Sequence, residues 1–297
     1  MKTADKLRFA TCASQLVRVA RKICGRADQA IVRRNGLVWE LDLREGIDLA
    51  IFLFGSFERE TARTLARLAR PGSVVLDIGA NIGAHTLPLA RSIGPTGKVY
   101  AFEPTDYAIG KLRRNLQLNP AIGSRAITIQ AKLGRKGDQS SSGEIYSSWK
   151  VGGNEPRHPK HLGIAQSTTG AINLSLDDYC RTNHISRVDL VKLDVDGFES
   201  EVIAGGMDIL RRDRPVICME LAPYVLEERG SSLEELLSLL TSCGYKLGSL
   251  TGESLTTEVV KLQNKIPDGS GINVLAIPKD LHANGMNFSS TRHFRGR

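Results

Sequence analysis

Short apolar runs alternate with longer amphipathic stretches over much of the chain, and this alternation predicts an α/β fold with a parallel sheet. The first run, at 74–77, lies between Pro71-Gly72 and Gly79 and is typical of a strand buried on both faces. Further strands are expected at 99–103, 127–130, 189–195, 215–221, 245–250 and 271–277. Helices are expected at 58–70, 83–92, 105–118, 202–210 and 232–243.

The segment 1–35 is basic, and its apolar residues recur at steps of three and four, which predicts an amphipathic helix. The recurring positions are Leu7, Ala10, Ala13, Ser14, Val17, Ala20 and Cys24, with Arg18, Arg21 and Lys22 beside them. Three settings stay open for this helix: docking on the rest of the chain, weak contact with an anionic membrane surface, or contact with acidic glycans. Because it lacks a face rich in Trp and Phe, docking or a solvated face is favoured.

The remaining chain divides into three parts. Within 36–70, strands at 37–43 and 47–54 are expected to form a hairpin around 44–46, ahead of a ligand-binding domain at 71–280. The polar stretch 135–170 is interpreted as a long loop, either a lid on the substrate side or a solvated insertion. Its candidate substrate contacts are Trp149, Arg157, His158 and His161. The tail at 281–297 is expected to be disordered.

Composition narrows the class of protein. A chain of 297 residues with 41% hydrophobic content can build one large domain with N-terminal additions. The net charge of +8 is concentrated at the two ends, and with 5% aromatic residues and no basic-aromatic runs we expect no nucleic-acid partner. The five cysteines show neither a zinc nor a disulfide pattern. No long uncharged apolar stretch or secretory signal is present, so a cytoplasmic location is expected.

A ligand site is predicted where the first strand ends. Asp77 ends the strand, the turn Gly79-Ala80-Asn81-Ile82-Gly83 follows, and a helix then begins, which is where ligands bind in open α/β sheets. The two glycines permit positive φ or close approach of a ligand, and Asn81 tolerates the left-handed region. The second strand ends in Glu103, which lies 24 positions after Gly79.

The kind of ligand follows from departures from the dinucleotide fingerprint. The spacing is not G-x-G-x-x-G, and an acid just before the turn disfavours a phosphate and favours a cationic ligand. S-adenosylmethionine fits, because it carries a sulfonium and an ammonium group and no phosphate. Glu103 is close to the offset at which an acid binds ribose hydroxyls. We therefore expect cofactor contacts from Asp77, Gly79, Ala80, Asn81, Gly83, His85, Thr86, Glu103 and Pro104.

A second motif, Lys192-Leu193-Asp194-Val195-Asp196-Gly197-Phe198-Glu199, matches the pattern K-[IL]-D-[VI]-[ED]-G-x-E. Together with 74–103 it resembles the FkbM family of S-adenosylmethionine-dependent methyltransferases, over about 36–277 and weakly across 135–170. The resemblance implies a Rossmann-like class I methyltransferase fold: a mostly parallel seven-stranded sheet, helices on both faces and a closing antiparallel pair. It also implies transfer to a hydroxyl of a sugar, glycolipid or secondary metabolite. Many related enzymes carry an acid after the third strand, where this chain has Ala131-Lys132, so adenine recognition is assigned to backbone groups or Gln130.

The candidate catalytic residues are Asp194, Asp196 and Glu199, at the carboxyl end of the fourth strand. Lys192 points to the same face of the strand as Asp194 and pairs with its charge. The acids are suited to accepting a hydroxyl proton, orienting the acceptor or sharing a divalent cation, although no metal motif is present. Alternatively Asp194 or Glu199 caps the next helix. Glu220, at the end of the fifth strand, is a candidate substrate contact.

Two other functions stay open at this point. One is a nicotinamide-dependent oxidoreductase, against which the position of Asp77 and the missing third glycine argue. The other is a catalytically silent binding module at a glycan or membrane surface. Neither the acceptor nor the oligomeric state follows from the sequence.

Overall fold

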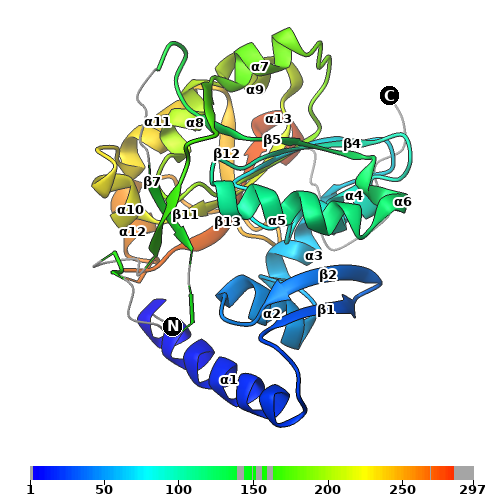
Figure 1. Ribbon diagram of the computed structural model, residues 1–297. Helices are drawn as coiled ribbons and strands as arrows, with labels where there is room; N and C mark the ends of the chain where they lie inside the picture. Colours follow the sequence, from blue (N-terminus) through cyan, green and yellow to red (C-terminus); the bar gives the residue numbers. More distant parts are fainter. Residues whose placement is uncertain are drawn as a thin grey trace.

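A seven-stranded sheet forms the centre of the computed structural model, which describes residues 3–138, 144–148, 150–151, 156–158, 163–267 and 269–283 (Figure 1). The strand order is β12-β13-β11-β10-β3-β4-β5. Their bounds are β3 Val74–Ile78, β4 Lys98–Phe102, β5 Ala126–Ile129, β10 Leu190–Leu193, β11 Val216–Leu221, β12 Tyr245–Gly248 and β13 Ile272–Pro278. Because β13 runs antiparallel to both neighbours and the other pairings are parallel, the expected sheet with its closing antiparallel pair is confirmed.

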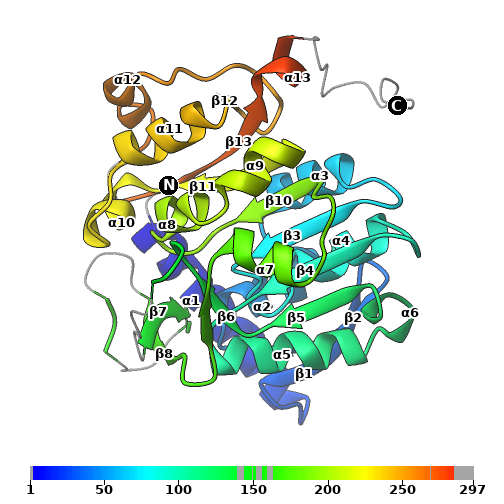
Figure 2. The same cartoon turned by 90° about the horizontal axis from the view of Figure 1, so that it is seen from above.

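Helices cover both faces of this sheet and form two hydrophobic cores (Figure 2). Successive side chains of β3 point to opposite faces of the sheet and so contribute to both cores: Leu76 and Ile78 belong to one core and Val75 to the other. The first core receives α7 (Leu176–Thr182), α8 (Glu199–Ala204), α9 (Met207–Asp213), α10 (Pro223–Glu228), α11 (Leu233–Ser242) and α12 (Val259–Gln263). The second receives α3 (Arg59–Leu68), α4 (Thr86–Ser92), α5 (Asp106–Gln117) and α6 (Pro120–Gly123).

The N-terminal region differs from its prediction. After helix α1 (Thr3–Ile23), which is the expected N-terminal helix, the hairpin is formed by β1 (Gln29–Arg34) and β2 (Leu37–Asp42). Its turn is Asn35-Gly36, where both residues have positive φ, 48° and 78°. The hairpin predicted around 44–46 is therefore wrong, because 47–54 belongs to helix α2 (Gly46–Phe54). That helix buries Leu49 and Ile51 and ends at Gly55, whose φ of 78° closes it.

Three further elements depart from the sequence-based expectation. The helix expected at 202–210 is two helices, α8 and α9, separated by Gly205-Gly206. The polar stretch 135–170 contains a hairpin of β7 (Glu144–Ser148) and β8 (Ile164–Ser167), and a small parallel sheet pairs β6 (Ala131–Leu133) with β9 (Ile172–Leu174). The start of the tail forms α13 (Lys279–Ala283), while the rest of it lies outside the described residues. In the part of the chain that the structure describes, no helix is long and apolar enough to cross a membrane.

Candidate functional site

A cavity of about 500 Å³ lies at the carboxyl ends of β3, β4, β10 and β11, with α1 and α2 on its other side. Its wall carries six carboxylates, Glu58, Glu103, Asp194, Asp196, Glu199 and Glu220. Two lysines, Lys132 and Lys192, face them. Because the acids outnumber the lysines, the cavity is suited to a positively charged ligand and disfavours phosphate groups.

The turn after β3 forms one wall of the cavity and closes on itself. Gly79 has φ 77° and Asn81 has φ 48°. The N–H groups of Gly79 and Ala80 donate to the Phe102 carbonyl at 3.0 and 2.9 Å, and that of Asn81 donates to Glu103 Oε2 at 2.9 Å. The Ile82 N–H donates to the Asn81 side chain at 2.8 Å. Since these N–H groups are all used within the chain, the turn offers no cradle for a pyrophosphate, which argues against a nicotinamide dinucleotide.

Two glycines of this turn are required by packing. A Cβ on Gly79 would lie 1.8 Å from the Asp194 carbonyl oxygen, so only glycine lets β3 and β10 approach each other here. A Cβ on Gly83 would lie 2.6 Å from side-chain carbons of Leu87 and of Leu112. Gly83 therefore serves the contact between α4 and α5.

Glu103 directly follows β4, and its buried carboxylate accepts hydrogen bonds from nearby residues of the chain. Its Oε1 accepts hydrogen bonds from the N–H and the hydroxyl of Thr105 at 3.0 and 2.6 Å, and its Oε2 accepts from Asn81. Burial raises its pKa, although these hydrogen bonds act in the opposite direction. A carboxylate oxygen has two acceptor positions, and the described residues use both positions of Oε1 but only one of Oε2, so Glu103 retains one acceptor position for a ribose hydroxyl of a nucleoside-type ligand. The Glu103 carboxylate as an acceptor for ribose, together with the other acids of the cavity wall as partners for the cationic groups, fits S-adenosylmethionine.

Lys192 is the buried cation beneath the cavity, and it joins the two motifs found in the sequence. Its Nζ donates to the Gly79 carbonyl at 2.8 Å and lies 3.4 Å from Asp194 Oδ2 and 3.9 Å from Asp77 Oδ1. Burial alone would lower its pKa, but Asp194, Asp77 and Glu58 outweigh that effect and raise it. The expected pairing of Lys192 with Asp194 is therefore present.

Asp77 lies behind this lysine. It is fully buried, and its Oδ2 accepts a hydrogen bond from the Thr86 hydroxyl at 2.6 Å. Its Oδ1 has no hydrogen-bond partner among the described residues. Of the expected cofactor contacts that the structure describes, Asp77, Gly83 and Thr86 are not part of the cavity wall, whereas Gly79, Ala80, Asn81, His85, Glu103 and Pro104 are. The first three therefore support the wall from behind.

The three candidate catalytic acids, Asp194, Asp196 and Glu199, all line the cavity just after the end of β10. Burial raises the pKa of Glu199 to about 7, although its carboxylate accepts the N–H groups of Val195 and Gly197 at 3.1 and 3.4 Å. Asp196 has φ 50°, and burial together with Asp194 and Glu199 raises its pKa well above the ordinary range. Glu199 thus holds the turn before α8 and also faces the cavity. It does not cap the helix, because it is the first residue of α8 and its carboxylate accepts N–H groups that precede the helix, so the capping interpretation is wrong for it.

Glu58 and His85 also line the cavity, and their side chains lie close to each other. Glu58 has φ 41° at the start of α3, and sequence reasoning missed it because no local motif surrounds it. Its Oε2 accepts a hydrogen bond from Asn273 at 3.2 Å and lies 3.9 Å from His85 Nε2. Burial lowers the pKa of His85 to about 3, so its ring is neutral, and neither ring nitrogen has a hydrogen-bond partner in the described part of the chain. Glu220 also faces the cavity, as expected for a substrate contact.

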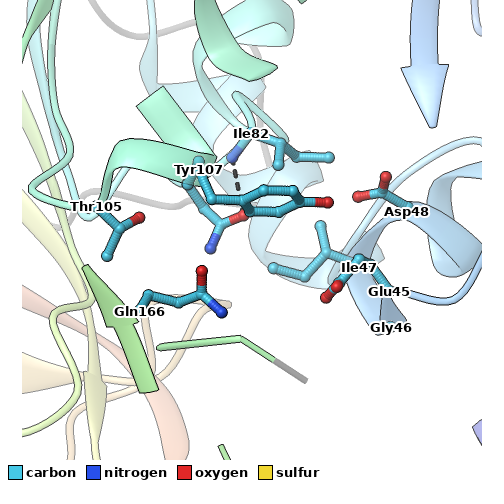
Figure 3. A pocket seen from close by; sticks show the side chains of 10 residues that line it. Glu45, Gly46, Ile47, Asp48, Ile82, Thr105, Tyr107 and Gln166 are labelled. Carbon is cyan, nitrogen blue, oxygen red and sulfur yellow. Dashed lines mark hydrogen bonds between the residues drawn. The ribbon is translucent and has the colours of Figure 1, made fainter. Parts of the chain in front are cut away.

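A small hollow of about 20 Å³ adjoins the cavity, with Gly46 and Ile47 on the wall of both (Figure 3). Figure 3 shows the Tyr107 hydroxyl directed toward Asp48. Asp48 is buried, and its Oδ2 accepts hydrogen bonds from the Asp42 N–H and from Lys111. A hollow of this size holds about one water molecule, so it is part of the scaffold.

The predicted contacts from 135–170 lie elsewhere or outside the described residues. Arg157 donates to the Lys150 carbonyl at 2.7 Å, and His158 lies 3.7 Å from Glu228; neither is on the described cavity wall. Trp149 and His161 lie outside the described residues. From this region the wall includes Ile145. Among the residues that the structure describes, no three His, Cys, Asp or Glu side chains are placed to hold a metal ion.

The chain is similar to several known methyltransferases. The methyltransferase FkbM domain model matches residues 77–247. The chain is 30% identical over 181 residues to the 2-O-methyltransferase NoeI of Sinorhizobium fredii, covering 59% of this chain and 74% of NoeI. It is 27% identical over 155 residues to the hexuronic acid methyltransferase AglP of Haloferax volcanii, covering 52% of this chain and 58% of AglP. A solved S-adenosylmethionine-dependent O-methyltransferase of Thermotoga maritima is 15% identical, with a TM-score of 0.42, and the match covers 87% of this chain and 80% of that one.

The domain match begins at Asp77, so it contains the turn after the first strand, Glu103 and the whole second motif from Lys192 to Glu199. It covers more than half of the chain, and the sheet order and the acid-rich cavity accord with it. This chain therefore belongs to the FkbM family and is an S-adenosylmethionine-dependent methyltransferase.

Proposed function

We propose that this enzyme transfers the methyl group of S-adenosylmethionine to a hydroxyl oxygen of a sugar. The observation that carries the proposal is the cavity at the sheet edge, where six carboxylates and two lysines surround a space of about 500 Å³. Two relatives support the acceptor class, because NoeI is a 2-O-methyltransferase and AglP acts on a hexuronic acid. A cavity rich in carboxylates also offers the hydrogen-bond acceptors that sugar hydroxyls need.

In this proposal two parts of the cavity wall divide the work. Gly79, Ala80, Asn81 and Glu103 hold the methyl donor, and Lys192 fixes that wall through the Gly79 carbonyl. The donor supplies an electrophilic methyl group on a positively charged sulfur. The part of the wall just after β10 presents the catalytic acids to the acceptor hydroxyl.

Glu199 is the best placed of the three acids to act as general base, because a group with a pKa of about 7 combines availability with basicity at neutral pH. It takes the hydroxyl proton as the O–C bond forms and the S–C bond breaks. Asp194, held by Lys192 at 3.4 Å, and Asp196 orient the acceptor. Alignment of the two substrates in the cavity contributes much of the remaining acceleration.

The test uses S-adenosylmethionine labelled in its methyl group, incubated with a panel of methyl glycosides and uronic acids. Each sugar is paired with its deoxy analogue, so that loss of one hydroxyl identifies the oxygen that is methylated. The expected result is label on a sugar oxygen, located by mass spectrometry. Calorimetric binding of the donor without turnover on any sugar would point to a silent binding module.

A further inference from the structure

Helix α1 carries a stripe of exposed apolar side chains that we call the α1 stripe: Phe9, Cys12, Leu16, Val19 and Ile23. They are spaced alternately three and four residues apart, which places them on one face of the helix. Phe9 is 67% exposed, Leu16 73%, Val19 59% and Ile23 81%. A contiguous patch of exposed large apolar side chains is typical of a surface that binds a protein, a ligand or a membrane.

The opposite face of α1 is fixed on the protein. The Ser14 hydroxyl is buried and donates to the Leu43 carbonyl at 2.8 Å, and Val17 packs against the second core. Arg18 pairs with Asp28 at 2.8 Å, and Arg21 donates to the Ala27 carbonyl at 3.0 Å. The docking setting expected for this helix is therefore found, but it uses a different face from the α1 stripe. Figure 1 shows the helix lying beside α2 at one end of the molecule.

Charge identifies the partner of the α1 stripe. Residues 1–34 contain nine Lys and Arg and two Asp, so this segment supplies +7 of the net +8. Lys22, in the last turn of α1, and Arg26, just after the helix, are exposed. A second copy of the same segment would bring like charges together, which is unfavourable, whereas an anionic bilayer complements both the charge and the apolar face.

The α1 stripe is also continuous with the mouth of the cavity. Phe9 is part of the stripe and of the cavity wall, and Ala10 lines the cavity beside it. Phe54 on α2 is 54% exposed and belongs to the same wall, as does Phe57. A bilayer against the stripe would therefore lie next to an apolar entrance, while the carboxylates lie deeper.

We propose that the α1 stripe docks this enzyme on an anionic lipid bilayer and so presents the cavity to sugars that are carried on lipids. The part that concerns the acceptor rests on the proposed sugar O-methylation, whereas the docking part does not. In this arrangement the apolar entrance receives the lipid end of the acceptor and the acidic floor receives its sugar.

The first experiment measures binding of the full chain to sedimented vesicles of phosphatidylglycerol and phosphatidylcholine, compared with phosphatidylcholine alone. Leu16→Asn removes an exposed apolar group, and Gln15→Asn, at the neighbouring exposed position off the stripe, is the matched control. We expect the wild type to bind the anionic vesicles, more weakly as salt is added. Leu16→Asn should weaken binding about tenfold or more, since a Leu side chain loses its burial. Gln15→Asn should bind like the wild type.

A second readout uses the exposed Cys12 within the α1 stripe, labelled with an environment-sensitive dye in a Cys24→Ser background. Its emission should shift to the blue with anionic vesicles. Absence of vesicle binding by the wild type, or equal losses in both Asn variants, would overturn the proposal. So would a dimer that Leu16→Asn converts to monomer without any vesicle binding.

The two proposals fail separately. Donor binding by calorimetry and methyl transfer to water-soluble sugars should be the same in wild type and Leu16→Asn, and their absence would count against the proposed function alone. Transfer to the same sugar on a lipid anchor in vesicles should fall in Leu16→Asn and not in Gln15→Asn. Equal transfer by both variants would overturn the role of the α1 stripe in presenting the acceptor.

Discussion

Lys192→Met is expected to be strongly destabilising, because it leaves both the Gly79 carbonyl and the buried Asp77 carboxylate without their partner. The change keeps the apolar stem but removes the donor to the Gly79 carbonyl and the cation 3.9 Å from the fully buried Asp77. Breaking a buried ion pair by removing one partner costs about 3–5 kcal/mol. A lost hydrogen bond adds about 1 kcal/mol. With an unfolding entropy of about 2 cal/mol/K per residue, a chain of 297 residues should melt about 6–10 °C lower.

The penalty should depend on pH in a defined direction. Burial already raises the pKa of Asp77 above 3.8, and loss of Lys192 raises it further. The folded protein then holds the Asp77 proton more tightly than the unfolded chain does, so acid favours the folded state of the variant. The destabilisation should be full above the folded pKa of Asp77 and shrink as the pH falls toward 3.8.

Urea unfolding and calorimetry of three variants test this reasoning. Lys98→Met is the control, because Lys98 is exposed and its Nζ donates only to the Ser124 carbonyl, at 3.1 Å, among the described residues; it should cost less than about 0.5 kcal/mol. The double variant Lys192→Met/Asp77→Asn removes the stranded charge and should recover at least about 2 kcal/mol. A loss below about 1 kcal/mol in Lys192→Met, or no recovery in the double variant, would refute the role given to this pair.

Three further predictions concern the cavity. The kcat/KM for the methyl donor, which reports the enzyme without bound donor, should rise with pH through about 7 as Glu199 ionises, and Glu199→Gln should remove this inflection; an unchanged profile in the variant would exclude it as the base. Gly79→Ala should give no stable protein, because its Cβ would lie 1.8 Å from a carbonyl oxygen, whereas Gly137→Ala, with φ 79° and no atom of the described residues within 4 Å of the new Cβ, should cost about 1–2 kcal/mol by thermal unfolding. Similar losses at both glycines would show that the close approach at Gly79 is not limiting. Asp194→Asn should keep calorimetric donor binding within a few-fold but lower kcat about 100-fold or more, and an active variant would remove Asp194 from the chemistry.

The parallel sheet could be predicted because its strands are short apolar runs with clear ends, whereas the N-terminal hairpin could not. The run 47–54 is apolar throughout, and periodicity cannot distinguish a strand from a buried helix in a run of this length. The hairpin signal was Asn35-Gly36, a dipeptide that supplies the two positive φ values that a tight turn needs. Similarly, Gly205-Gly206 separates α8 from α9. Glycine is needed at position 205 because a Cβ there would lie 2.0 Å from the Gly134 carbonyl oxygen.

The site was predictable where its residues share a strand or a turn. The spacing of Lys192 and Asp194 placed both on one face, and the structure has them 3.4 Å apart. Glu58 could not be found in this way, since it reaches the cavity from the start of α3 and its neighbours His85 and Asn273 are far from it in sequence. The burial of Asp77 behind the cavity wall could not be predicted either, because a carboxylate at the end of a strand can face the ligand or the layer behind it.

The distribution of partners among the acids explains how one cavity serves both binding and chemistry. Asp77 and Glu103 are held by hydroxyl and N–H donors of the chain, so their positions are fixed before any ligand arrives. Asp196, Glu199 and Glu220 lie near Asp194, and burial together with repulsion from this neighbouring carboxylate raises the pKa of each, although Glu199 also accepts N–H groups of the chain. Any positive charge in the cavity lowers the pKa of such carboxylates. Glu199 is then more fully ionised at neutral pH when a cationic donor is bound than when it is absent, so this arrangement supplies the base when it is needed.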